Sequence, residues 1–88
     1  MKIKDNFIFQ KVAGEFLVVP IAEEATRVNG VIKLNEAGAF LWDILKARNL
    51  NETELISKLV AEYHIDTGTA SQDVKQFIDS LKSIGCLE

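Results

Sequence analysis

The chain has 88 residues, of which 48% are hydrophobic and 26% are charged, and its net charge at pH 7 is −3. This composition is typical of a soluble globular protein with one small core, and it excludes a disordered chain. No apolar run approaches the roughly 20 residues that a membrane-spanning helix needs, and the N-terminal residues lack the pattern of a signal peptide. We therefore expect a single domain over residues 1–88, located in the cytoplasm and without a membrane partner.

The first third of the chain predicts an antiparallel sheet of three strands. Aromatic and β-branched residues are concentrated in three segments, residues 6–13, residues 16–21 and residues of about 28–34. Gly14 supplies a positive φ for a hairpin turn, and Pro20 belongs at an edge or at the end of its strand. A polar stretch in which one helical turn fits leads to the third strand. Because consecutive strands usually pair, we expect a meander with the third strand at an edge.

The rest of the chain predicts three helices. Apolar residues recur at helical spacing in three segments, from Asn35 to about Ala47, from Asn51 to about Tyr63 and from about Thr69 to Ile84. Each begins with a capping pattern: Asn35, then Asn51 with Glu54, then Thr69 with Gln72. Gly85 is placed to end the last helix. The fold class is therefore α+β, a three-stranded antiparallel sheet followed by a three-helix bundle (βββααα), similar to a winged helix-turn-helix.

Two residues of the first predicted helix need a reason. Trp42 is either an exposed hot spot for a partner or part of the core, and its spacing beside the strand favours the core. Gly38 costs about 1 kcal/mol relative to alanine in a helix, so we expect that the helix packs closely against a neighbour there.

No catalytic, cofactor or metal site is predicted. The only histidine, His64, falls at a helix end, where a surface or capping role is the better interpretation. The only cysteine, Cys86, lies near the C-terminus, where we expect a small buried side chain rather than a nucleophile. One histidine and one cysteine do not make a structural zinc site, and no phosphate-binding glycine loop is present. We therefore expect that the chain is not an enzyme.

Four segments in order resemble the PqqD family, the group of pyrroloquinoline quinone biosynthesis protein D. The first matches the pattern Leu-Asn-Glu-x-Gly-Ala-x-x-Trp, and the resemblance extends over about residues 5–88. The segments are Leu34–Trp42, Asn51–Leu55, Leu59–Asp66 and Asp73–Gly85. The resemblance implies the same βββααα fold. It also implies a peptide chaperone or RiPP recognition element, which binds the leader of a ribosomally made precursor peptide and presents that precursor to a maturation enzyme, often a radical SAM enzyme. We expect a free-standing domain with no fused maturation enzyme.

By the same resemblance, the leader adds as a strand to the third strand, in the cleft against the third helix. Strand addition suits an exposed edge, whose unpaired N–H and C=O groups supply affinity. Lys33 acts as a gatekeeper that keeps this edge from pairing when it is empty, and Leu34 is expected in the core. The predicted peptide-binding residues are Asn29, Gly30, Val31, Ile32, Lys33 and Leu34 from the strand and Asp73, Gln76, Phe77, Ser80 and Leu81 from the helix.

Two other classes of function stay open. A winged-helix fold also serves DNA binding, but residues 35–88 carry five basic and nine acidic side chains, and that balance is poorly suited to a phosphate backbone. We therefore expect no nucleic-acid partner. The third class is a structural domain that forms a homodimer, edge strand to edge strand.

Overall fold

The computed structural model describes residues 1–27 and 30–88, and within them it has three strands and four helices. The strands are β1 (Phe7–Val12), β2 (Glu15–Pro20) and β3 (Ile32–Leu34). They form one antiparallel sheet in the order β1-β2-β3, with β3 at an edge. The predicted meander and the edge position of the third strand are therefore confirmed.

The hairpin between β1 and β2 has a two-residue turn. Ala13 and Gly14 both have positive φ values, 51° and 80°, the pattern of the type I′ turn that matches the twist of paired strands. Pro20 is the last residue of β2 and lies opposite Phe7, so its missing N–H falls at the end of the hydrogen-bonded ladder between β1 and β2. Both features agree with the prediction from sequence.

The third strand is shorter than predicted. Its pairing with β2 covers only residues 32–34, whereas the sequence predicted about 28–34. Gly30 has a φ of 120°, which a β-strand does not use, so the extended ladder begins after it. Residues 28 and 29 lie outside the described part of the chain.

The helices are α1 (Glu24–Arg27), α2 (Glu36–Ala47), α3 (Glu52–Tyr63) and α4 (Thr67–Ser83). The first is the single turn that the polar stretch allowed. Asn35 caps α2 by accepting a hydrogen bond from the backbone N–H of Gly38 at 2.8 Å. Asn51 and Glu54 form the reciprocal capping box of α3. The α+β fold class, with a sheet followed by three main helices, is confirmed.

The start of α4 corrects the sequence prediction. The cap is Asp66 rather than Thr69, and the helix begins at Thr67. The Asp66 carboxylate accepts from the backbone N–H of Thr69 at 2.7 Å and from its hydroxyl at 3.1 Å. A carboxylate offers two acceptor oxygens and a charge that the helix dipole favours, so it is the stronger cap. At the other end Gly85 has a φ of 66°, as expected of a residue that ends a helix.

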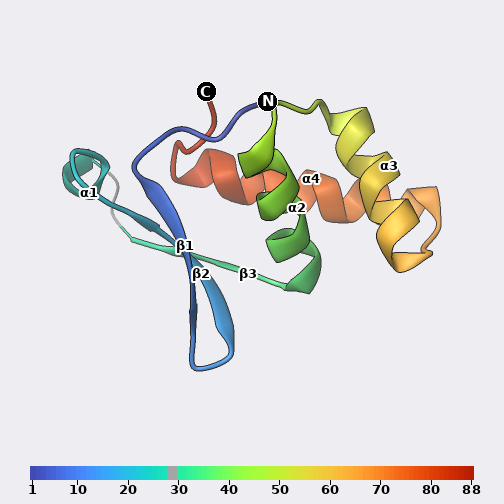
Figure 1. Ribbon diagram of the computed structural model, residues 1–88, viewed down its shortest axis with the longest axis horizontal. Helices are drawn as coiled ribbons and strands as arrows, with labels where there is room; N and C mark the ends of the chain where they lie inside the picture. The colour runs from blue at the N-terminus through green and yellow to red at the C-terminus, as the bar shows by residue number, and fades with distance from the viewer. Residues whose placement is uncertain (28–29) are drawn as a thin grey trace.

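The core lies between the sheet and the three main helices (Figure 1). Trp42 is only 3% exposed, so the core interpretation of this residue is confirmed. Leu34 and Cys86 are also buried, as predicted. The two ends of the chain lie close together in Figure 1, where Ile3 pairs with Leu87. Among the described residues, no helix has the length and apolar character to cross a membrane.

Candidate functional site

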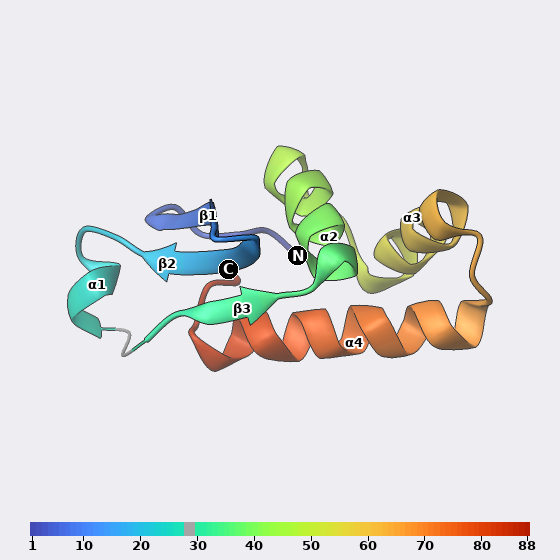
Figure 2. The same ribbon diagram turned by 90° about the horizontal axis from the view of Figure 1, so that it is seen from below.

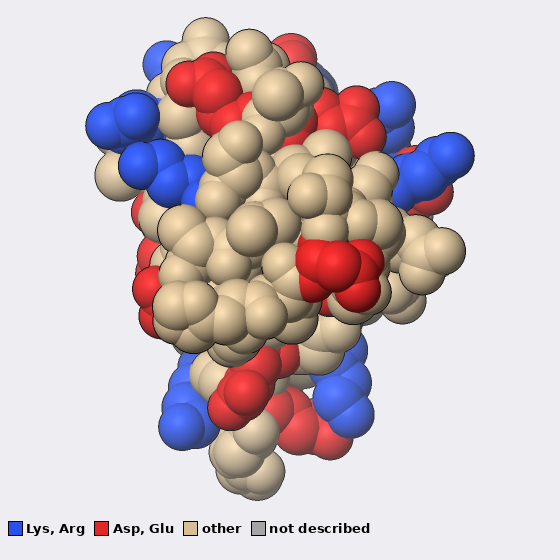
Figure 3. All heavy atoms as spheres, turned by 90° about the vertical axis from the view of Figure 1, so that its right-hand side faces the viewer, with Lys and Arg blue, Asp and Glu red and all other residues tan. Residues whose placement is uncertain are grey.

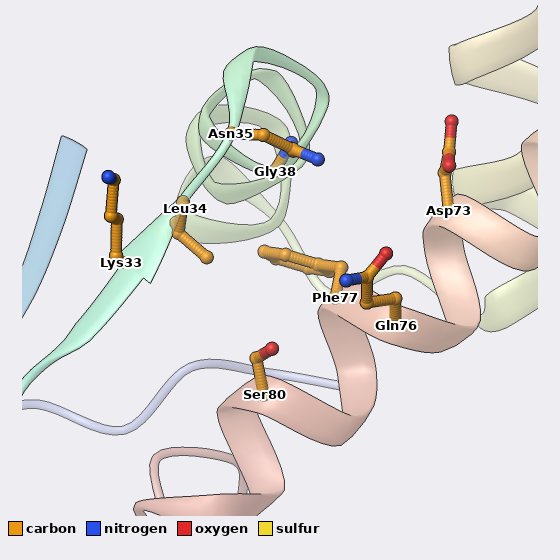
Figure 4. Close-up of a pocket in the computed structure, with 8 residues that line it drawn as sticks. All are labelled: Lys33, Leu34, Asn35, Gly38, Asp73, Gln76, Phe77 and Ser80. Carbon is orange, nitrogen blue, oxygen red and sulfur yellow. The ribbon is translucent and has the colours of Figure 1, made fainter. Parts of the chain in front are cut away.

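A pocket lies between β3 and α4. Figure 2 shows the strand running beside the C-terminal half of the helix, and the two elements are in contact. The pocket has a volume of about 250 Å³. We call it the β3–α4 pocket, and its lining residues, shown in Figure 4, are Lys33, Leu34, Asn35, Gly38, Asp73, Gln76, Phe77 and Ser80.

The strand side of the pocket is held by the junction between β3 and α2. Leu34 is 6% exposed and points toward Phe77 in Figure 4, so it anchors the end of the strand in the core. Asn35 follows directly and fixes the start of α2 through its bond to the N–H of Gly38. The backbone therefore turns from strand to helix within one residue, and β3 is held in a defined position beside α4.

Gly38 has a packing reason. A Cβ atom at this position would lie 3.2 Å from the Cβ of Leu34 and 3.3 Å from the Oδ1 of Asn35. The predicted close approach is therefore present, but the neighbour is the strand end that precedes the helix rather than another helix. The absent side chain also leaves space at the pocket wall.

The helix side of the pocket is one face of α4. Asp73, Gln76, Phe77 and Ser80 stand at the i, i+3, i+4 and i+7 spacing that places side chains along one stripe. Phe77 is 3% exposed and forms the apolar floor, whereas Gln76 is exposed. Asp73 and Ser80 are half-buried. An apolar floor with polar groups along its rim suits a side chain presented from an extended backbone.

The outer edge of β3 carries no partner strand within residues 1–27 and 30–88. The Lys33 side chain reaches toward the neighbouring strand, where its ammonium group pairs with the Glu15 carboxylate on β2 at 2.9 Å. Val31, just before the strand, is 52% exposed. The edge therefore presents backbone groups of β3 beside a pocket with an apolar floor, and the Lys33 charge is matched within the sheet.

The structure brings together six of the predicted peptide-binding residues in the β3–α4 pocket, namely Lys33, Leu34, Asp73, Gln76, Phe77 and Ser80. Ile32 is half-buried in β3 and packs against the core, and Gly30 and Val31 are exposed residues that precede the strand. Leu81 is fully buried and does not line the pocket. Asn29 lies outside the described residues.

Two lining residues, Asn35 and Gly38, were missed as site residues. The sequence contained a signal for both, since a glycine in the first turn of a helix leaves the backbone beside the capping residue uncovered by a side chain. Neither His64 nor Cys86 lines the pocket. His64 ends α3 in the left-handed region with a φ of 53°. Cys86 is fully enclosed, and burial raises the pKa of its thiol to about 11.

Three comparisons with known proteins bear on this arrangement. The model of the family described as Coenzyme PQQ synthesis protein D (PqqD) matches residues 15–87. No curated protein sequence matches the chain.

Two solved structures have a similar fold. One is TbiB1 in complex with the TbiA(beta) leader peptide, with a TM-score of 0.74 and 23% identity, covering 100% of this chain and 95% of that chain. The other is lasso peptide synthetase B1 complexed with the leader peptide, with a TM-score of 0.70 and 15% identity, covering 97% of this chain and 93% of that chain. At these identities the likeness establishes a shared fold.

Proposed function

The chain belongs to the PqqD family, and from this membership we propose that residues 1–88 form one non-catalytic domain that captures the leader of a ribosomally synthesised precursor peptide. The leader adds as a strand to the outer edge of β3, and its side chains enter the β3–α4 pocket. The observation that carries this proposal is the unpaired edge of β3 lying beside a pocket with an apolar floor. The leader peptides named in the two similar structures support it.

The physical chemistry of the edge supports strand addition. Backbone N–H and C=O groups on an open edge form main-chain hydrogen bonds with any extended peptide, and pockets beside the edge select among side chains. Here Phe77 supplies an apolar surface, and Asp73, Gln76 and Ser80 supply polar groups around it. We assign peptide contacts to these residues, to β3 and to the exposed Gly30 and Val31 before it. The peptide contacts of β3 are made by its backbone, whereas the side chains of Ile32 and Leu81 support the site from within.

The experiment is a titration of ¹⁵N-labelled protein with synthetic copies of the leader segments of candidate precursor peptides. Amide resonances of residues 30–34 and 70–84 should shift, and those of the hairpin between β1 and β2 should not. Ser80→Phe fills the pocket and should weaken binding by about tenfold or more, because the added ring takes the space of a peptide side chain. Shifts confined to another surface would contradict the proposal.

Ser83→Phe is the matched control. Ser83 lies one turn further along α4, is exposed, and does not line the β3–α4 pocket. This variant should bind the leader as the unchanged protein does. Equal binding by Ser80→Phe and Ser83→Phe would place the peptide elsewhere.

We also propose that the bound leader brings its precursor to a separate maturation enzyme, of the radical SAM type that the family resemblance implies. Copurification of that enzyme with this chain, with and without the leader, tests this step. A homodimer that pairs two β3 edges would compete with the leader. Analytical sedimentation distinguishes the homodimer from the monomer. If the chain is such a dimer, added leader should lower the sedimenting mass. If it is a monomer, added leader should raise the mass by that of one leader.

A further inference from the structure

A second pocket adjoins the β3–α4 pocket. It has a volume of about 280 Å³ and lies where the start of α2 meets the end of α3. We call it the Tyr63 pocket, and its lining residues are Asn35, Glu36, Ala37, Tyr63, Ile65 and Asp73. Asn35 and Asp73 line both pockets, so the two adjoin at these residues. Asn35, Glu36 and Ala37 follow the last residue of β3, so the Tyr63 pocket lies at the Leu34 end of the strand.

The floor of the Tyr63 pocket is apolar and already formed. Ala37 and Ile65 are half-buried and pack against the core. Tyr63 is 39% exposed, and its ring meets Phe40 edge-on, with 5.8 Å between ring centroids and an angle of 88°. The Tyr63 hydroxyl lies 3.5 Å from the carbonyl oxygen of Glu36 and donates to it. The exposed face of this ring is therefore held in position rather than left free to collapse.

The rim of the Tyr63 pocket is acidic. Neither Glu36 nor Asp73 forms an ion pair with any residue that the structure describes, and the pocket lining contains no lysine or arginine. Partial burial, reinforced by the carboxylates of Glu36 and Glu62, raises the pKa of the Tyr63 hydroxyl. Figure 3 shows the end of the molecule where α3 passes into α4. On this face the lysine and arginine side chains lie toward the margins, and the charged side chains nearer the centre are acidic.

We propose that the Tyr63 pocket takes an arginine or lysine side chain of the same peptide whose neighbouring segment pairs with β3. The methylene stem of such a residue packs on Ala37 and Ile65, because long basic side chains bury their stems and keep their charge at a surface. The cationic head lies against the face of Tyr63 and between the carboxylates of Glu36 and Asp73. This inference rests on the proposed function, since it assumes a peptide on β3, and it adds the chemical class of one recognised side chain.

The experiment begins with a phage-displayed library of random 12-residue peptides, selected on the intact chain. Ser80→Phe, which fills the β3–α4 pocket, serves as the counter-selection. We expect enriched peptides to combine apolar residues at alternating positions with an arginine or lysine to one side of them. Selection on the double variant Glu36→Gln/Asp73→Asn should lose the preference for a basic residue at that position.

Affinity is then measured by fluorescence anisotropy with a fluorescein-labelled synthetic copy of the most enriched peptide. Replacing its basic residue by norleucine, which keeps the stem and removes the charge, should weaken binding about fivefold, the size of a partly exposed ion pair with a cation–π contact. On the double variant the two peptides should bind equally. Glu52→Gln and Asp79→Asn are the matched controls. They remove one carboxylate charge each by the same types of substitution, on α3 and α4 outside both pockets, and should leave the fivefold difference intact.

The outcomes are distinct. If no peptide is enriched over the Ser80→Phe counter-selection, the proposed function fails and the inference fails with it. Enriched peptides without a basic position would overturn the inference alone. A basic preference that survives in the double variant, with thermal unfolding showing that the variant is folded, would also overturn it. Loss of the preference in the double variant but not in the two controls supports it.

Discussion

Replacing Gly38 by alanine should lower the stability of the protein even though alanine is the better helix former. Alanine gains about 1 kcal/mol over glycine in a helix. At this position, however, the new Cβ would lie 3.2 Å from the Cβ and 3.3 Å from the Cδ2 of Leu34, and 3.3 Å from the Oδ1 of Asn35. The two contacts with Leu34 carbons are shorter than the 3.5 to 4.0 Å or so at which carbon atoms attract.

The crowded atoms cannot easily move. The Cβ of Leu34 is fixed to the backbone of β3, the residue is 6% exposed, and the Asn35 oxygen is held by its bond to the N–H of Gly38. Overpacking of this kind costs roughly 1–3 kcal/mol, so after the propensity gain we expect a net loss of about 1 kcal/mol. Strain at this junction also shifts β3, and the added methyl narrows the β3–α4 pocket, so peptide binding should weaken as well.

Urea unfolding followed by the fluorescence of Trp42 measures this effect. Trp42 is the only tryptophan and is 3% exposed, so its emission changes when the core opens. Ala39→Gly is the control, because it measures the glycine-to-alanine difference one residue along the same helix, and it should cost about 1 kcal/mol. The reasoning is refuted if Gly38→Ala raises the unfolding free energy by as much as Ala39→Gly lowers it.

Three further predictions follow from the same packing. Leu34→Ala should lower the free energy of unfolding in urea by about 2–3 kcal/mol, which is at the low end for buried leucines because the site opens onto a pocket. A loss of less than about 1 kcal/mol would mean that Leu34 does not anchor β3. Backbone and hydroxyl donors of Thr69 lower the pKa of Asp66 below 3.8, so the stability advantage over Asp66→Ala should be constant at neutral pH and shrink as acid protonates the carboxylate. A gap that does not change with pH would exclude this charge effect. With burial holding the pKa of its thiol at about 11, Cys86 should resist a disulfide reagent at pH 8 until urea unfolds the chain, and rapid native labelling would contradict its burial.

Local features of the fold could be predicted from the sequence. The caps Asn35 and Asn51 act on N–H groups three residues away, so the pattern that encodes them lies within one helical turn. The hairpin at Gly14 and the C-terminal Gly85 likewise depend on the φ that glycine adopts at little cost. Where a local prediction failed, as at Thr69, two neighbouring capping residues competed, and the stronger acceptor, Asp66, took the helix start.

The candidate site was predictable in part. The sequence placed Phe77 and Ser80 on the α4 face that meets β3, and the structure brings both into the β3–α4 pocket. Leu81, which follows Ser80 directly, was predicted as a site residue and is fully buried instead. At each margin of a helical stripe, the spacing alone does not define whether a residue is buried or lines the pocket. The way α4 packs in the fold decides this for each such residue.

The order of the strands and helices and the residues that cap them follow from local sequence, because they depend on side chains within a few residues of the backbone groups that they satisfy. The space between β3 and α4 depends instead on tertiary packing, since Leu34 and Phe77 are far apart in the chain and meet through the shared core. The place of the Tyr63 pocket next to the β3–α4 pocket, with Asn35 and Asp73 lining both, belongs to this second kind. Packing at long sequence separation sets them, and no local pattern encodes it.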